Sequence, residues 1–185
     1  AHGLAAGARG APAVIGAGPR EIGDRQVRLR EITMEDAPEL YRWRMHESSR
    51  PMFRSTAAVP YEAHLDYLRR YFDPANTDRW FVIEEFGAPA GTIVLYDIDP
   101  EGGEAEWGRL VIAPELRSRG LASRGLALLV RHARELKLKR LRCEVLAGNA
   151  HAEKLYRETG FRETGTDDDA SGRRFVRLAL DLQEP

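Results

Sequence analysis

The chain has 185 residues, with 28 Lys and Arg against 29 Asp and Glu and a formal net charge of −1, which is typical of one ordinary globular domain. This balance disfavours a nucleic-acid-binding surface, which requires an excess of Lys and Arg. A single cysteine, Cys143, excludes an intramolecular disulfide, and the five histidines lack metal-ligand spacing, so no metal is expected. No apolar run approaches the ~20 residues of a membrane span. We expect no membrane association and a cytoplasmic location.

The first 25 residues are expected to form a disordered or tag-like tail. Residues 1–20 hold seven Ala and five Gly without a hydrophobic period. Residues 14–19 resemble the opening of a dinucleotide-binding turn, but Glu21 stands where a third glycine is required and no strand–helix–strand unit surrounds the motif. We therefore expect no nucleotide site there, and a single folded domain over residues 26–185.

The amino-terminal half of this domain predicts two helices followed by a three-stranded meander. Residues 27–32 alternate apolar and charged side chains, as a half-buried strand does. Residues 33–36 have a capping-box pattern, which predicts a helix that ends near His46, and Pro60 opens a second helical stretch that ends before Asp73. Strands are then expected at 79–85, 91–97 and 105–112, separated by turns that contain Gly and Pro.

The carboxy-terminal half switches to a strand–helix–strand crossover. Apolar residues recur at helical spacing over 122–136, and residues 141–145 alternate as a strand. A short helix over 150–159 ends at Gly160. Residues 161–164 and 174–182 then predict a closing hairpin, with the acidic residues 167–169 in its loop. The whole pattern predicts a mixed α/β domain.

The strand–turn–helix segment over residues 110–122 has the order of an anion-binding site. The N–H groups at the start of a helix point toward an incoming anion, and the helix dipole favours negative charge there. Gly120 allows close approach of the backbone, while Arg117 and Arg119 flank the turn as expected phosphate donors. Residues 117–142 hold nine Lys or Arg and one Glu, which supports a local anion site in a chain that is nearly neutral overall.

Two motifs give the chain a resemblance to a known family. Residues 117–122, Arg-Ser-Arg-Gly-Leu-Ala, fit the pattern Gln/Arg-x-x-Gly-x-Gly/Ala, although Ser118 replaces a frequent glycine. A second stretch opens with Asn149, carries Tyr156 seven residues later, and ends in a Gly-Phe pair. In these motifs and in element order, residues 27–182 resemble the GNAT superfamily of N-acetyltransferases, closest in outline to those that act on ribosomal proteins or amino sugars.

The resemblance implies a GNAT fold and an acetyl-CoA site. The fold is a mixed, mostly antiparallel sheet of six to seven strands with about four helices on both faces, and the strands over 105–112 and 140–146 splay apart to admit acetyl-CoA, the acyl donor. The implied contacts are backbone groups of Leu110, Val111 and Ile112 to the pantetheine arm, N–H groups of Arg117, Ser118, Arg119, Gly120, Leu121, Ala122 and Ser123 to the pyrophosphate, and Asn149 to the arm from the opposite strand.

Two side chains are candidates for proton transfer. By the resemblance, Tyr156 protonates the departing thiolate; the alternative is a core aromatic with a merely satisfied hydroxyl. Alternation places Glu106 with Glu104, Gly108 and Leu110 on one strand face, from which Glu106 can draw a proton through water. The alternatives are an exposed edge carboxylate at Glu106, or a reaction without a dedicated base.

The acceptor is expected to be a small-molecule amine. Trp43, Arg44 and His64 lie in segments similar to acetyltransferases of nucleotide-linked amino sugars, and they are the candidate substrate residues. Trp43 as a core anchor and His64 as a surface residue remain the structural alternatives. Other acceptors are protein N-termini, or an aminoglycoside-like amine facing the acidic loop 167–169, and a non-catalytic acyl-CoA binding module is a further alternative. The chain is expected to be a monomer or a homodimer.

Overall fold

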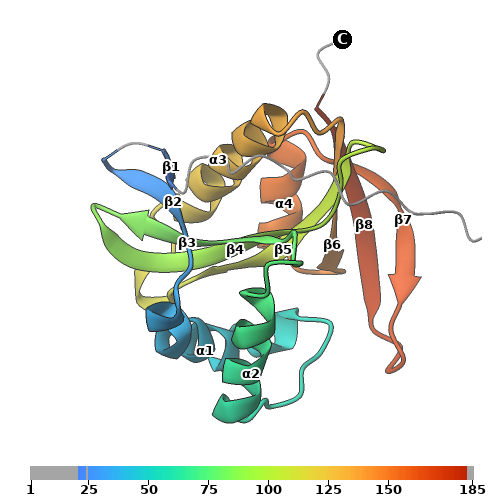
Figure 1. Cartoon of the computed structure of the whole chain (residues 1–185). Helices are drawn as coiled ribbons and strands as arrows, with labels where there is room; N and C mark the ends of the chain where they lie inside the picture. The colour runs from blue at the N-terminus through green and yellow to red at the C-terminus, as the bar shows by residue number, and fades with distance from the viewer. Residues whose placement is uncertain (1–20, 24, 183–185) are drawn as a thin grey trace, which may run out of the picture.

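A computed structural model describes residues 21–23 and 25–182. One sheet of eight strands runs in the order β1-β2-β3-β4-β5-β6-β8-β7. Among the strands of the described residues, only the β5–β6 pair is parallel. The sheet separates α1 and α2 on one face from α3 and α4 on the other (Figure 1). The strands are β1 (Glu21–Gly23), β2 (Val27–Glu31), β3 (Arg79–Glu85), β4 (Ala88–Asp99), β5 (Glu104–Ile112), β6 (Arg140–Leu146), β7 (Arg162–Asp168) and β8 (Arg174–Asp181). The helices are α1 (Ala37–Met45), α2 (Tyr61–Tyr71), α3 (Leu121–Glu135) and α4 (Ala150–Glu158), with 3-10 turns at Met34–Asp36, Arg50–Met52 and Pro114–Leu116.

This architecture confirms the predicted fold class, with one strand more than expected. The additional strand is β1, which pairs antiparallel with β2 and buries Ile22. It lies inside the segment 1–25 that was predicted to be a tail, because one apolar residue among three gives no periodicity to detect. Residues 1–20, including the glycine motif at 14–19, lie outside the described residues. Within the described residues, no helix is long and apolar enough to cross a membrane.

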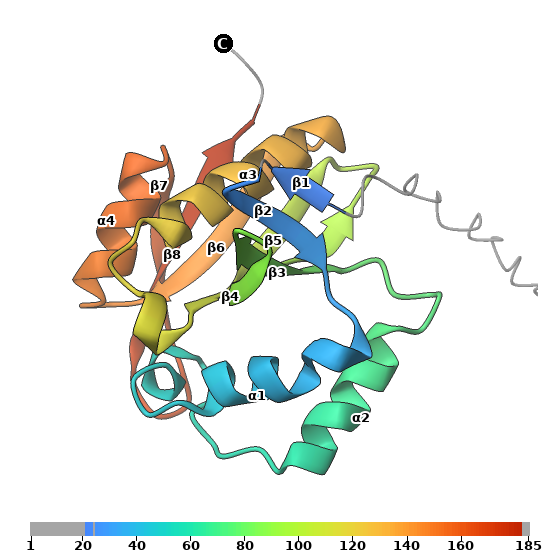
Figure 2. The same cartoon turned by 90° about the vertical axis from the view of Figure 1, so that its left-hand side faces the viewer.

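Each face of the sheet has its own hydrophobic core. The larger core packs α3 and α4 against the sheet, and α3 contributes Leu126, Leu129 and Ala133, none of them exposed (Figure 2). The smaller core lies under α1 and α2 and is built around Leu40, Trp43 and other buried side chains. The helical spacing of these apolar residues explains why each helix buries one face.

A polar network fixes the start of α1. The Asp36 carboxylate accepts a hydrogen bond from the Thr33 N–H at 2.7 Å, as the predicted capping box requires. The same carboxylate receives two bonds from the Arg30 guanidinium on β2, at 2.8 and 3.0 Å. Arg30 also donates to the buried Glu84 of β3 at 2.7 Å. These bonds tie the first helix to two neighbouring strands.

The closing hairpin is longer than predicted. Strand β7 extends through Asp168, so Asp167 and Asp168 belong to a strand and the loop covers residues 169–173. Pairing with β8 continues to Asp168 opposite Arg174, which stabilises extended backbone where the sequence favoured a turn. The side chains of all three acidic residues form ion pairs: Asp167 with Arg54, Asp168 with Arg174, and Asp169 with Arg173. They therefore form no free acidic pocket of the kind considered for aminoglycosides.

Candidate active site

Strands β5 and β6 are paired only over their first residues. The parallel register joins Glu104 to Arg140, Ala105 to Leu141 and Glu106 to Arg142. Beyond these pairs, β5 continues to residue 112 and β6 to residue 146. The strands separate after Glu106, so the facing backbone groups beyond it have no strand partner on that side. Such an opening suits an amide-bearing ligand, because unpaired strand N–H and C=O groups require hydrogen-bond partners.

A bulge in β5 redirects the strand at this opening. The register with β4 shifts between Thr92 and Val94, whose partners are Val111 and Gly108. Arg109 lies in the extra segment with φ of 51°, a left-handed conformation that is uncommon outside glycine. Gly108 faces the Tyr96 hydroxyl, to which an added Cβ would come within 3.0 Å. Gly108 and Arg109 therefore both face the α1–α2 side, as expected for a two-for-one bulge.

Because of the bulge, one sequence prediction is wrong, and one further residue lies on the same strand face as Glu106. Leu110 was expected on the same face as Glu106 by simple alternation, but it packs against the core on the α3–α4 side. Because one extra residue shifts the alternation, Val111 packs on the α1–α2 side and Ile112 on the opposite side. Arg109 consequently joins Glu106 on the α1–α2 face, a position that alternation did not assign to it.

Tyr156 lies beneath the opening. It comes from α4 and is 8% exposed. Its ring packs edge-on against Trp107 of β5, with centroids 4.9 Å apart. Burial first, and then the neighbouring Cys143 of β6, raise the pKa of Tyr156 above its ordinary value. Tyr156 therefore contacts one of the separating strands, lies near the other, and keeps its proton at neutral pH.

Glu106 occupies the other face of the opening. Its Oε1 accepts a hydrogen bond from the Tyr96 hydroxyl at 3.0 Å. Burial raises the pKa of this carboxyl group, and the negative charges of Glu144 and Asp97 add to that effect, while the Tyr96 hydrogen bond and Arg142 oppose it. Glu104 lies at the exposed end of the strand, 3.6 Å from the Arg142 Nε. Of the two predicted carboxylates, Glu106 is thus the one with a perturbed environment near the opening.

The turn before α3 presents backbone N–H groups. Gly120 is the residue preceding the helix, with φ of 74° and ψ of 6°, and Ser118 is also left-handed with φ of 63°. The first helical bond runs from the Arg124 N–H to the Gly120 C=O at 3.1 Å. The N–H groups of Leu121, Ala122 and Ser123 therefore have no partner within the helix, which leaves them available to an anion.

The side chains of Arg117 and Arg119 do not point into this turn as predicted. Arg117 donates to the hydroxyls of Ser48 and Ser49, at 2.7 and 2.9 Å, and Arg119 forms an ion pair with Glu85 at 3.0 Å. These guanidinium groups are thus engaged with side chains of the protein, and their contact with a phosphate stays a prediction. Arg117 also donates to the nearby Ile112 oxygen at 3.4 Å, but the two serines and Glu85 lie more than thirty residues away in sequence, so no local pattern reveals them.

Asn149 begins α4, as its place in the second motif predicts. Its side chain accepts a hydrogen bond from the Ala152 N–H at 3.3 Å, which caps the helix. The side-chain amide also lies 3.7 Å from the sulfur of Met52. Met52 belongs to the loop between α1 and α2, so this loop reaches the mouth of the opening.

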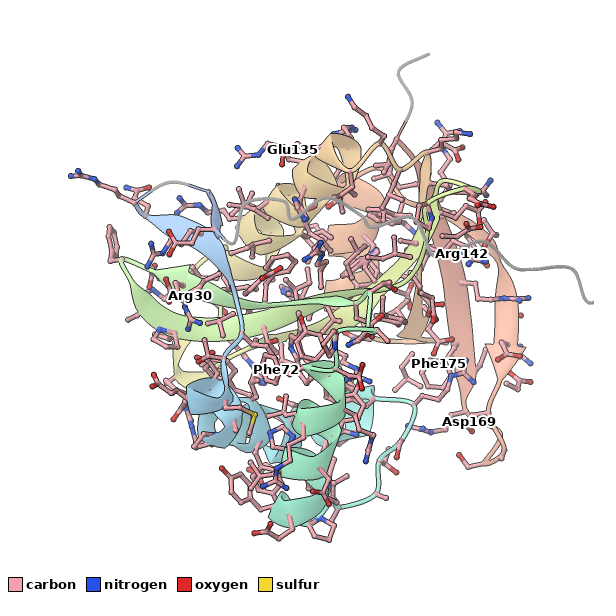
Figure 3. All side chains as sticks on the ribbon, in the orientation of Figure 1. Arg30, Phe72, Glu135, Arg142, Asp169 and Phe175 are labelled. Atoms are coloured by element: carbon pink, nitrogen blue, oxygen red, sulfur yellow. The ribbon has the colours of Figure 1, made fainter. Side chains whose placement is uncertain are left out.

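The same α1–α2 loop is fastened to the closing hairpin. Arg54 forms ion pairs with Glu144 of β6 and with Asp167 of β7. Arg173 donates to the backbone oxygens of residues 51, 53 and 54. Both guanidinium groups lie over the ring of Phe175, at 4.5 and 5.4 Å from its centroid. Figure 3 labels Phe175 and Asp169 on the side of the hairpin that meets the loop.

Two of the three candidate substrate residues belong to the packed interior. Trp43 is 1% exposed and lies in the core under α1 and α2, so the predicted contact with a substrate ring is wrong and the core-anchor alternative is correct. His64 is 8% exposed, and its Nε2 lies 3.0 Å from the Ala37 oxygen. It links α2 to α1 and packs beside the rings of Tyr41 and Tyr61, which contradicts both the acceptor-pocket and the surface interpretations.

Arg44 differs from these two residues. Its guanidinium stacks 3.9 Å from the centroid of the Phe53 ring and donates to the Ser55 oxygen at 2.5 Å. The NH1 nitrogen is buried without a hydrogen-bond partner. Burial lowers the pKa of Arg44, and the charges of Arg109 and Arg50 lower it further. Arg44 thus keeps unused donor capacity close to other cations.

Comparisons with known proteins agree with this geometry. The model of the acetyltransferase (GNAT) family matches residues 37–161. None of the curated protein sequences is significantly similar to the chain. Among solved structures, spermidine N-acetyltransferase from Vibrio cholerae in complex with CoA and spermine has a TM-score of 0.78 at 20% identity, over 86% of this chain and 97% of that one. A putative acetyltransferase from T. thermophilus has a TM-score of 0.71 at 21% identity, over 90% and 91% of the two chains.

The separating strands, the glycine turn and the family match together define the class of protein. The chain belongs to the acetyltransferase (GNAT) family and is an N-acetyltransferase. The solved structures, at about one fifth identity, support the same fold. In the described part of the chain, no three His, Cys, Asp or Glu side chains gather into a group that could hold a metal ion.

Proposed function

We propose that this protein transfers an acetyl group from acetyl-CoA to the primary amine of a small molecule. The observation that carries the proposal is the position of Tyr156, which packs against β5 and lies near Cys143 of β6 where these strands separate. A hydroxyl at that point can meet a thioester placed between the strands. The V. cholerae neighbour, solved with CoA and spermine, supports a CoA donor and an amine acceptor.

The residues present fit acetyl-CoA. The unpaired edges of β5 and β6 offer N–H and C=O groups to the amides of a pantetheine arm, at Leu110, Val111 and Ile112 among others. The turn at 117–123 offers helix-start N–H groups to a diphosphate. An added Cβ at Gly120 would meet no atom of the described chain within 4 Å, so the space in front of the turn is open to a ligand.

When bound, acetyl-CoA supplies the acetyl thioester. The neutral acceptor amine forms the new C–N bond to the acetyl carbon as the C–S bond breaks. Glu106 accepts the proton lost by the amine, directly or through a water molecule, and Tyr156 donates its phenolic proton to the departing sulfur. Burial raises the pKa of Tyr156, so its hydroxyl carries a proton at neutral pH that can be donated to the sulfur as negative charge develops there.

A small-molecule amine remains the proposed acceptor, but fewer residues now support it. Trp43 and His64 are buried and no longer argue for a nucleotide-linked amino sugar, while Arg44 remains. The amino sugar stays one candidate acceptor and a protein N-terminus another. The structural neighbours include spermidine acetyltransferases and one dodecameric assembly, and these properties belong to those proteins.

The test combines cofactor binding with turnover. Calorimetry should detect CoA binding by the wild-type protein, and a free-thiol assay over amino sugars, N-terminal peptides, aminoglycosides and spermidine should identify an acceptor. Tyr156→Phe should lower kcat by about 10²-fold or more, the range for a lost general acid, while CoA affinity stays within about twofold because the ring is retained. Tyr61→Phe, on the surface of α2, is the matched control. An unchanged kcat in Tyr156→Phe would return Tyr156 to a packing role.

A further inference from the structure

Several arginines of the described chain on the α1–α2 side of the sheet form no ion pair with an acidic residue, and among three of them the charges interact, since those of Arg50 and Arg109 both act on Arg44. Arg44 belongs to α1, Arg50 to the short turn after it, and Arg109 to the bulge of β5. No carboxylate oxygen of the described chain lies within 4 Å of their guanidinium nitrogens, whereas the neighbouring Arg42 and Arg54 are both paired with acidic residues. Charges of one sign repel, so the interaction among these groups is an electrostatic cost to the folded chain.

Arg109 is held toward this group by the backbone. Its left-handed conformation places the side chain on the α1–α2 face, where the guanidinium carbon lies 4.9 Å from the centroid of the Tyr67 ring and 5.3 Å from that of Trp80. Aromatic contacts of this kind orient a guanidinium group without using its N–H donors. No hydrogen bond or ion pair within the described chain uses the donors of Arg109, although its charge interacts with that of the Asp78 carboxylate, so these donors are available to a ligand.

The guanidinium group of Arg44 is likewise held by an aromatic ring. The Phe53 ring supports its guanidinium, one nitrogen is bonded to the Ser55 oxygen, and NH1 is buried without a partner. A buried donor without a partner is costly, which favours a ligand that supplies an acceptor atom. Burial and the charges of Arg109 and Arg50 lower the pKa of Arg44, and a bound anion would relieve that repulsion.

The position of these arginines connects them to the reaction. Arg109 follows Glu106 by three residues on β5, and the bulge brings both to the same face. Tyr96, which is bonded to Glu106, also lies within the electrostatic reach of Arg109. A molecule whose amine lies at Glu106 can extend along this face toward Arg109, whose charge in turn acts on Arg44.

We infer that the acceptor carries an anionic group, a phosphate or a carboxylate, in addition to its amine, and that Arg44, Arg50 and Arg109 bind this group. Planar guanidinium groups suit such oxygen anions because they donate two parallel hydrogen bonds. The inference rests on the proposed function and narrows its acceptor. It also opposes a polyamine such as spermidine, since a polycation at this position would be repelled.

Pairs of acceptors that differ in one anionic group test directly whether the enzyme selects for that group. The free-thiol assay compares glucosamine 6-phosphate with glucosamine, and alanine with alaninamide, so that each pair differs in one anionic group. We expect kcat/KM to be about tenfold or more higher for the anionic member of at least one pair, and lower for spermidine. The pair that responds distinguishes phosphate from carboxylate. Equal values in both pairs, or a preference for spermidine, would overturn the inference without affecting the proposed function.

Substitutions locate the effect. Arg109→Asn removes the charge but keeps a residue that tolerates the left-handed conformation, and Arg44→Gln removes the second charge. Each should raise KM for the anionic acceptor about tenfold or more and leave kcat within about threefold, while KM for the neutral partner is unchanged; Arg109→Lys should recover part of the loss. Arg131→Gln, on the exposed face of α3, is the control. Equal changes for both members of a pair would overturn the assignment.

A binding measurement separates this inference from the reaction. Calorimetric titration of glucosamine 6-phosphate and alanine into the protein with CoA present should show binding that weakens in Arg109→Asn. If no amine is acetylated and CoA does not bind, the proposed function itself has failed, and this inference fails with it. If CoA binds but neither anion shows binding that depends on Arg109, only the inference fails.

Discussion

Gly120 offers a clean test of the cofactor site, because the cost of changing it can be divided into two parts. Its φ of 74° is left-handed, and an alanine there is strained by about 1–2 kcal/mol. The added Cβ meets no other atom of the described chain within 4 Å. Gly120→Ala should therefore lower the free energy of unfolding by about 1–2 kcal/mol through backbone strain alone.

The second part is the cost to the ligand. We suppose that a diphosphate lies on the N–H groups of Leu121, Ala122 and Ser123. A methyl group at Gly120 would then keep the diphosphate farther from these backbone groups. Lost charge-assisted hydrogen bonds are worth about 1.5–3 kcal/mol each, so CoA affinity should fall about tenfold or more. Gly87 in the β3–β4 turn, with φ of 83° and equally open space, provides a matched control: Gly87→Ala should be destabilised to the same extent and bind CoA normally.

Urea denaturation gives the stability of both variants, and isothermal titration calorimetry gives their CoA affinity at a temperature where both are folded. Comparable destabilisation with a selective loss of binding in Gly120→Ala would support the site. Normal CoA affinity in Gly120→Ala would refute the reasoning, since the diphosphate would then lie elsewhere. Equal losses of affinity in both variants would show that strain, and not contact with the ligand, is responsible.

Three further predictions concern the remaining polar groups. Glu106→Gln should remove the acidic limb of the pH–rate profile. Burial raises the pKa of the Glu106 carboxyl above its ordinary value of 4.5, so this base becomes active only as the pH rises above that value. An unchanged acidic limb would indicate that water or another residue accepts the proton. Glu84 is buried and forms ion pairs with Arg28 and Arg30. Glu84→Ala should therefore lower the free energy of unfolding by about 2–3 kcal/mol, whereas the exposed Glu158→Ala should lower it by less than about 0.5 kcal/mol. Similar losses for the two variants in urea denaturation would contradict this difference. Burial lowers the pKa of His64 and of His132, so below their ordinary value of 6.5 the unfolded chain binds more protons than the folded one, and stability falls by at most about 1.4 kcal/mol per pH unit for each histidine. Urea denaturation between pH 7.5 and 5.5 gives the slope of the unfolding free energy against pH. This slope should be smaller in His132→Leu than in the wild type and unchanged in the exposed His151→Asn. Equal slopes in all three proteins would contradict a contribution of His132 to the pH dependence.

The order of the elements and the glycine turn before α3, the proposed cofactor site, follow from local signals in the sequence. The capping box at Thr33, the glycine before α3 and the Asn149 cap of α4 are backbone requirements that particular residue types satisfy within a few positions. The resemblance of the Asn149–Tyr156 spacing to the family motif singled out Tyr156 on this short helix, and its role as an acid stays a proposal. Such signals are local, so they survive in the sequence regardless of what packs against them.

The tertiary structure decided what these elements contact. Arg109 faces the proposed acceptor site only because β4 and β5 pair out of register by one residue, and simple alternation cannot reveal a mismatch between two strands. Trp43 and His64 are interior residues because α2 and the sheet cover them, and Arg117 is bonded to serines that lie far away in sequence. A guanidinium or imidazole group has many partners within its reach, and only the folded arrangement determines which of them lies at hydrogen-bond distance.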